Sequence, residues 1–103
     1  MYKIIFHNHQ RIYEIYANSV SMSDLFGFID VSDLVFAEAG QLLVDVAEEK
    51  LRAEFQGVEH SLIPMQAIIR IDQVAERGTA RISELGQQGN IMTFPGVPTP
   101  RRD

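Results

Sequence analysis

The residues with the clearest chemical potential are an Arg–Asp pair near the end of the stretch "SLIPMQAIIRIDQV". Arg70 and Asp72 are two residues apart, so in a strand they share one face. Gln66 and Ile68 lie on that same face of the expected strand. Either the pair keeps one face of a sheet solvated, or it forms a polar binding patch beside Ile68 that recognises a carboxylate or phosphate. The pattern favours the solvated face, because exposed ion pairs contribute little energy.

The other chemically active residue types do not form a recognisable site. His7 and His9 flank an expected turn, and His60 lies far along the chain, so they are interpreted as surface residues rather than metal ligands. The chain has no cysteine, no serine in a nucleophile elbow and no glycine-rich phosphate loop. Carboxylates are abundant and include Asp30, Asp33, Glu38, Asp45, Glu48, Glu49 and Glu54. Most of these fall at expected helix starts, turns or solvent faces. We therefore expect no enzyme activity, no metal and no cofactor.

Composition limits the class of protein. A chain of 103 residues has room for one hydrophobic core. The formal net charge of −5 disfavours a protein that neutralises nucleic-acid phosphates. No apolar run approaches the ~18 residues of a membrane span, and none is typical of a signal peptide. We expect a soluble, cytoplasmic protein with one globular domain over residues 1–85 and a flexible tail over residues 86–103.

The first part of the chain reads as strands. The alternating pattern of residues 2–7 and 11–17 predicts a hairpin. On one face of it, Tyr2, Ile4 and Phe6 are joined by the second-strand residues Tyr13, Ile15 and Ala17. Residues 18–24 are expected to be a loop, and residues 27–36 a strand. The apolar phase changes inside that strand, which predicts a bulge or sharp bend near Ser32-Asp33.

One helix is expected to follow a short apolar strand over residues 41–46. Asp45 can cap the helix, with Glu48 completing a capping box, and Gly57 can end it. An apolar stripe is expected to cover the second face of the hairpin, whose apolar members are Ile5, Ile12 and Tyr16. The stripe consists of Ala47, Leu51 and Phe55. Glu48 and Arg52 are expected to pair on the wet side.

The remaining strands resemble the end of a small barrel. A strand over residues 58–63 ends at Pro64, one 3₁₀-like turn follows at residues 65–67, and the next strand spans residues 68–74. This layout is similar to the last two strands of SH3-like and Sm-like barrels. Residues 76–85 can form either a closing strand or a short helix. The predicted fold is α+β: a mostly antiparallel, partly open barrel of five or six strands with one capped helix.

Five segments carry a family resemblance: "KIIFHN", "IYEIYA", "DLFGFIDVSDLVF", "EEKLRAEFQGV" and "IPMQAIIRIDQVAERGTARIS". In this order they resemble a bacterial family known as domain of unknown function 1820, over roughly residues 3–84. The resemblance implies a short cytosolic bacterial protein and transfers no catalytic or binding residue. The chain departs from the family pattern at "HNHQR", which has no glycine. That departure argues against a tight type I′ turn.

Aromatic residues give the main argument for binding. Phe26 and Tyr16 are the aromatics that we expect to be exposed, and the apolar "FPGVP" of the tail includes Phe94 and Pro95. Exposed aromatics can form a protein–protein hot spot, or can stack bases in an RNA-binding barrel together with Arg11 and Arg70. The acidic charge favours the protein partner. The candidate binding residues are Tyr16, Phe26, Ile68, Arg70, Asp72, Phe94 and Pro95.

The leading hypothesis is therefore a non-catalytic interaction or adaptor module. It would bind protein through its outer sheet face or through its tail. An RNA-binding small barrel is the alternative, and a small hydrolase or metal protein is a third hypothesis. Pairing of exposed edge strands into a homodimer is compatible with the first.

Overall fold

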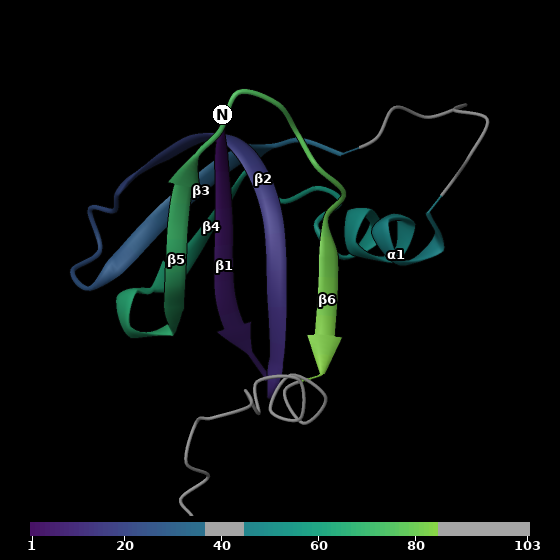
Figure 1. The fold of residues 1–103 in the computed structure, drawn as a ribbon. Helices are drawn as coiled ribbons and strands as arrows, with labels where there is room; N and C mark the ends of the chain where they lie inside the picture. The colour runs from purple at the N-terminus through teal and green to yellow at the C-terminus, as the bar shows by residue number, and fades with distance from the viewer. Residues whose placement is uncertain (37–44, 85–103) are drawn as a thin grey trace, which may run out of the picture.

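The computed structural model describes residues 1–36 and 45–84. One antiparallel sheet and one helix make up this part of the chain, so the predicted α+β class is confirmed (Figure 1). The elements are β1 (Tyr2–Asn8), β2 (Arg11–Met22), β3 (Phe28–Leu34), α1 (Val46–Glu54), β4 (His60–Pro64), the 3₁₀ turn η1 (Met65–Ala67), β5 (Ile68–Gln73) and β6 (Arg81–Glu84). The strand order is β4-β3-β2-β1-β5, with β6 paired to β2. No ladder joins β4 to β5 within the described residues, so the sheet is not closed into a barrel.

The predicted hairpin is confirmed, but its turn differs from the expectation. Asn8 pairs with Arg11, which leaves a two-residue turn of His9 and Gln10. Their φ angles are 55° and 62°, the left-handed conformation that a type I′ turn requires at both positions. The expectation of a looser turn was therefore wrong, because two residues other than glycine adopt this conformation.

The strand β2 is longer than predicted. The expected loop over residues 18–24 was wrong, because β2 continues to Met22 and pairs with β3. Ala17 is opposite Leu34 and Val20 is opposite Val31, and all four side chains belong to the core or pack against it. The core-facing phase thus changes in both strands at the same place, between these two pairs.

A residue with left-handed backbone conformation, Asp33, lies at the phase change. Asp33 has a φ of 58°, and its Oδ2 accepts a hydrogen bond of 3.1 Å from Nδ2 of Asn18 on β2. The pairing register is the same on both sides of Asp33. The predicted phase change near Ser32-Asp33 is therefore confirmed as a local bend of two paired strands, without the inserted residue of a bulge.

The helix begins as predicted. Asp45 Oδ1 accepts a hydrogen bond of 3.0 Å from the Glu48 backbone N–H, and Gly57, with a φ of 82°, follows the C-terminal end. The predicted apolar stripe was partly wrong, because Ala47 is exposed and Glu48 is 2% exposed. Leu51, also 2% exposed, is the residue of α1 that belongs to the buried core cluster.

Glu48 is buried because it has partners in the link between β5 and β6. Its Oε2 accepts a 3.0 Å hydrogen bond from the Ala80 N–H and lies 3.7 Å from Nη1 of Arg77. The expected pairing of Glu48 with Arg52 was wrong, since Arg52 lies 3.4 Å from Glu49 instead. A buried carboxylate that accepts a backbone N–H can be tolerated where an unpaired one cannot.

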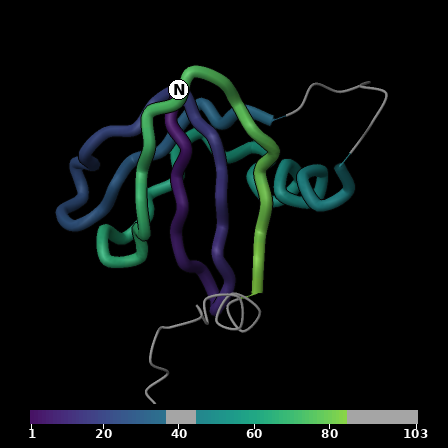
Figure 2. The backbone as a smooth tube through the Cα atoms, viewed as in Figure 1, coloured from purple at the N-terminus to yellow at the C-terminus, as the bar shows by residue number. Residues whose placement is uncertain are grey.

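The helix covers the opposite face of the hairpin from the one predicted. Leu51 packs with Ile4 and Ile15, and the Tyr13 hydroxyl donates to Glu54 Oε2 at 2.9 Å. Tyr16 lies on the other face and is covered by the β5–β6 link. That link passes over the top of the view and descends into β6 (Figure 2). A Cβ built on Gly78 would overlap the Tyr16 hydroxyl, so the link packs directly on this ring.

In the second half of the sheet, the structure agrees with the sequence-based prediction except at Ile68. The layout of strand, proline, 3₁₀ turn and strand is confirmed in β4, η1 and β5, and residues 81–84 form a strand rather than a helix. Ile5 pairs with Arg70 and Phe6 pairs with Ile68, so Ile69 is an extra residue in β5. The predicted strand over residues 41–46 falls mainly outside the described residues, and the predicted tail over 86–103 falls wholly outside them.

Candidate functional site

The turn between β2 and β3 exposes a phenylalanine. The Phe28 N–H donates to the Leu25 carbonyl at 3.3 Å, which defines a four-residue turn with Phe26 at its first corner. Gly27 follows with a φ of 85°, the sign that a type II turn requires there. The Leu25 N–H also donates to Ser23 Oγ at 2.9 Å. The turn is thus fixed by its own hydrogen bonds, and it leaves Phe26 97% exposed.

Other exposed apolar side chains lie beside this turn. The Met65 N–H donates to the Gly27 carbonyl at 2.9 Å, so η1 is attached to the turn, and the two lie at one side of Figure 1. Leu25 and Leu62 line one open cavity of about 390 Å³ together with Ser23, Asp24, Asp30 and His60. We call the exposed residues Leu25, Phe26, Leu62 and Met65 the tip patch. A cluster of exposed apolar residues indicates an interaction surface.

The charges beside the tip patch are negative. The chain has no lysine or arginine between Arg11 and Lys50, or between Arg52 and Arg70. Asp24 and Asp30 line the cavity with Leu25 and Leu62, and Asp30 Oδ1 lies 2.9 Å from Nδ1 of His60. The hydrogen bond that the His60 ring donates to Asp30, followed by the negative charge of Asp30, raises the pKa of His60. The two segments that form this surface therefore contribute carboxylates and one titratable imidazole.

The outer face of β1, β2, β5 and β6 differs from the tip patch, because charged side chains on it form ion pairs with one another. Arg70 Nε lies 2.9 Å from Asp72 Oδ1 on the same strand. The Glu14 carboxylate lies 3.5 Å from Lys3 Nζ and 3.7 Å from Arg81 Nε. An exposed pair with its partner on the same strand fits the solvated-face interpretation of Arg70 and Asp72.

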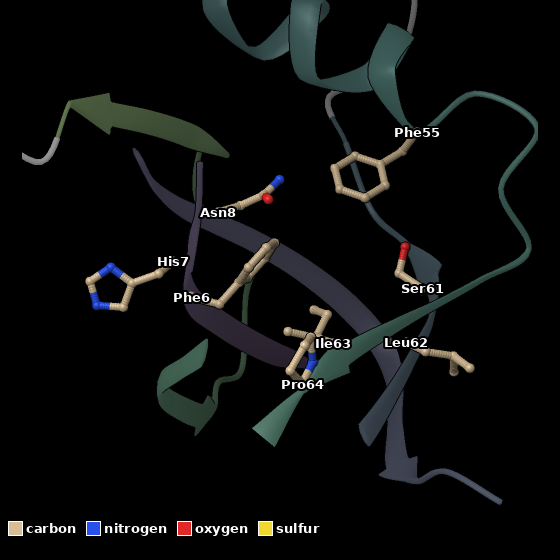
Figure 3. Close-up of a pocket in the computed structure, with 8 residues that line it drawn as sticks. All are labelled: Phe6, His7, Asn8, Phe55, Ser61, Leu62, Ile63 and Pro64. Carbon is tan, nitrogen blue, oxygen red and sulfur yellow. The ribbon is translucent and has the colours of Figure 1, made fainter. Parts of the chain in front are cut away.

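A hollow on the inner side of the sheet is the second candidate. Residues of β1, β4 and the end of α1 line a cavity of about 210 Å³ (Figure 3). The rings of Phe6 and Phe55 point into this space, whereas the His7 imidazole points away from it. Phe6 also stacks on Tyr13 with centroids 5.0 Å apart. His7 is the one acidic or basic side chain among the described residues that line this hollow.

The predicted site residues are not brought together as one site. Phe26 is exposed as predicted, but Tyr16 is 8% exposed, so its predicted exposure was wrong. Ile68 packs against the core, and the extra residue Ile69 places it on the face opposite to Arg70. Phe94 and Pro95 lie outside the described residues.

Sequence reasoning did not identify Leu25, Leu62 and Met65. A signal for Leu62 was present, because strand alternation places it opposite in phase to the buried Ile63. A weaker signal for Leu25 was Gly27 two residues later, because glycine favours a turn. The contact between η1 and the turn joins segments that are distant in sequence, so no local sequence pattern predicts it.

Two further findings concern sites and membranes. Within residues 1–36 and 45–84, no three His, Cys, Asp or Glu side chains gather closely enough to bind a metal ion. The one helix of this part of the chain is too short and too polar to cross a bilayer.

Comparison with known proteins places the chain in a family. The sequence pattern of Domain of unknown function (DUF1820) matches residues 1–96. The chain therefore belongs to this family, and the resemblance inferred from the five segments is confirmed. The match extends beyond Glu84 and includes Phe94 and Pro95. No curated protein and no solved structure matches the chain.

Proposed function

We propose that this protein is a non-catalytic interaction module that binds a protein partner through the tip patch. The observation that carries the proposal is Phe26, which is 97% exposed at the corner of a hydrogen-bonded turn. The backbone of this turn is already fixed by its hydrogen bonds, so a partner that buries Phe26 has only the side chain left to order. Aromatic anchors commonly dominate binding energy at protein interfaces.

The RNA-binding alternative has weaker support. Each arginine in the described residues lies within 4.0 Å of a carboxylate, and none of these pairs is beside Phe26. The pairs are Arg11–Glu84, Arg52–Glu49, Arg70–Asp72, Arg77–Glu48 and Arg81–Glu14. A surface that binds a phosphate backbone requires cations available to it, with a stacking ring nearby.

We also infer that the sheet is related to the SH3-like small barrels. The order β4-β3-β2-β1-β5 places β4 and β5 at the two ends of the sheet, and a single 3₁₀ turn connects them. That arrangement supports a partly open barrel, and it is compatible with many functions. A cytoplasmic bacterial adaptor is the role that we assign to this fold.

Affinity capture from a native bacterial lysate tests the proposed function. The full chain, Phe26→Ser and Ile69→Ser are compared, with and without nuclease. Ile69 is the matched control, because it is 46% exposed on β5 and is not part of the tip patch. We expect a nuclease-resistant partner that is lost with Phe26→Ser and retained with Ile69→Ser.

Three other outcomes contradict parts of the proposal. Retention of the partner by Phe26→Ser would show that the tip patch is not the contact. Partners that vanish with nuclease would favour the RNA-binding alternative. A partner that binds the full chain, but not a chain ending at Leu85, would transfer the contact to the segment with Phe94 and Pro95.

A further inference from the structure

We propose that the tip patch recognises a positively charged amphipathic segment, in which an apolar anchor is flanked by lysine or arginine. This inference rests on the proposed function and specifies the chemistry of the partner. It follows from two features of the surface: its charge, and the apolar and acidic walls of the cavity beside it.

The charge distribution of the described chain is uneven. The lysines and arginines of residues 1–36 and 45–84 lie on β1, the start of β2, α1, β5, the β5–β6 link and β6. The segments of the tip patch, residues 18–34 and 58–67, contain none. They do contain Asp24, Asp30 and Glu59, with His60 paired to Asp30. A partner of opposite charge is attracted to such a surface, and the attraction raises its association rate.

The cavity beside Phe26 combines apolar and acidic walls. Leu25 and Leu62 supply the apolar part of this space of about 390 Å³, and Asp24 and Asp30 supply carboxylates. Asp24 makes no hydrogen bond or ion pair with the other described residues. A lysine or arginine side chain matches these walls, because its methylene stem packs on leucine while its charged head reaches a carboxylate.

The same charges disfavour the other occupants of an apolar surface. A second copy would bring an identical acidic face against the first, and like charges across an interface oppose association. Nucleic acids and anionic lipid surfaces are repelled for the same reason. The cationic peptide is therefore the occupant that both the apolar and the acidic parts of this surface favour.

Selection from a random dodecapeptide display library tests the inference. The full chain is immobilised, and Phe26→Ser is selected in parallel to identify peptides that require the tip patch. Enriched peptides are then titrated against the wild type, Asp24→Lys and Glu76→Lys. The last two variants change the net charge equally, but Glu76 is exposed on the β5–β6 link. Unfolding curves establish that each variant is folded.

We expect the enriched peptides to combine an aliphatic or aromatic residue with at least two lysines or arginines. Phe26→Ser should weaken their binding about tenfold or more, as expected of a hot spot. Asp24→Lys should weaken it several-fold and Glu76→Lys much less, and added salt should reduce the affinity.

The contrary outcomes separate the two proposals. Phe26-dependent enrichment of acidic or uncharged peptides overturns the charge inference and leaves the tip patch as a protein-binding surface. Absence of any Phe26-dependent enrichment overturns both. Sedimentation at the selection concentration completes the test. A dimer that dissociates on Phe26→Ser would show that the occupant is a second copy.

Discussion

The two sides of this molecule use similar residues for different purposes. At the tip patch, Leu62 is 42% exposed and Phe26 is 97% exposed. At the other side, which we call the helix end, α1 packs beside β6 and the β5–β6 link, and Leu51 is 2% exposed (Figure 1). The apolar groups of the helix end contribute to folding, whereas those of the tip patch remain available to a partner.

The carboxylates show the same contrast. Glu48 is 2% exposed and accepts the Ala80 N–H, so it joins two segments that are distant in sequence. Asp24 is exposed and has no partner among the described residues. Burial and a hydrogen bond from a backbone N–H therefore distinguish the structural carboxylate of Glu48 from that of Asp24, which is accessible to a ligand.

The largest predicted loss of stability is that of a substitution at Leu51. Leu51→Ala should lower the free energy of unfolding by about 3 kcal/mol, because it removes a buried side chain and leaves a cavity in the core. Leu62→Ala makes the same chemical change at an exposed site and should cost less than about 1 kcal/mol. Urea unfolding of both variants measures the difference. Equal losses would contradict the contrast between the two sides.

Substitution of Glu48 is expected to cause the next largest loss of stability. Glu48→Ala should lower the free energy of unfolding by about 2 kcal/mol, because the buried Ala80 N–H loses its acceptor. The control is Glu49→Ala in the same turn of α1, which removes only the exposed pair with Arg52 and should cost about 0.5 kcal/mol or less. Glu48→Gln retains an acceptor and should fall between them. If Glu48→Ala were no worse than Glu49→Ala, the hydrogen bond to Ala80 would not contribute to stability.

The sequence predicted the parts of the fold that depend on local patterns. Alternation predicted the hairpin and its inner face, Asp45 predicted the helix start, and Pro64 predicted the end of β4. Each of these depends on residues within a few positions of one another. The phase change at Asp33 was also visible, because the apolar residues of one strand record it directly.

Two of the errors are local, namely the turn at His9 and Gln10 and the partner of Arg52. The errors that matter most for the fold and the site involve contacts between distant segments. The face that α1 covers depends on a polar contact, since Glu48 meets Ala80 across 32 positions. Tyr16 was expected to be exposed, but Gly78 packs on its ring. The candidate site was predicted only in part for the same reason. The exposure of Phe26 could be predicted from the sequence. Leu62 and Met65 lie beside it because of strand pairing and the hydrogen bond to Gly27, which are tertiary contacts.

Gly78 tests the cover over Tyr16. Gly78→Ala should lower the free energy of unfolding by roughly 1–2 kcal/mol, because the new methyl group would overlap the Tyr16 ring and displace the link. Thr79→Ala is the matched control, since Thr79 is exposed next to it. Pairing Gly78→Ala with Tyr16→Phe should recover part of the loss, because the hydroxyl is the closest atom. No loss in Gly78→Ala would mean that the link does not depend on this contact.

The smallest effect is the pH dependence of the pair formed by His60 and Asp30. The pKa of His60 is raised above 6.5, mainly by its hydrogen bond with Asp30 and then by the negative charge of Asp30. The pair's stabilisation is therefore complete below pH 6.5 and is lost as the pH rises through the raised pKa. An NMR titration of the imidazole measures that pKa. Asp30→Asn should return it toward 6.5, and an unchanged value would exclude Asp30 as the cause.

The same titration sharpens the contrast between the two sides. When His60 loses its proton, the surface beside Phe26 becomes more negative and Asp30 loses its cationic partner. Binding of a cationic peptide should therefore strengthen modestly as the pH rises through the pKa of His60, while the helix end is unaffected. His60→Gln should bind with little change over that range, because it carries no titratable charge. If His60→Gln kept the full pH dependence, the titrating group would lie elsewhere, and the acidic surface would not act through this pair.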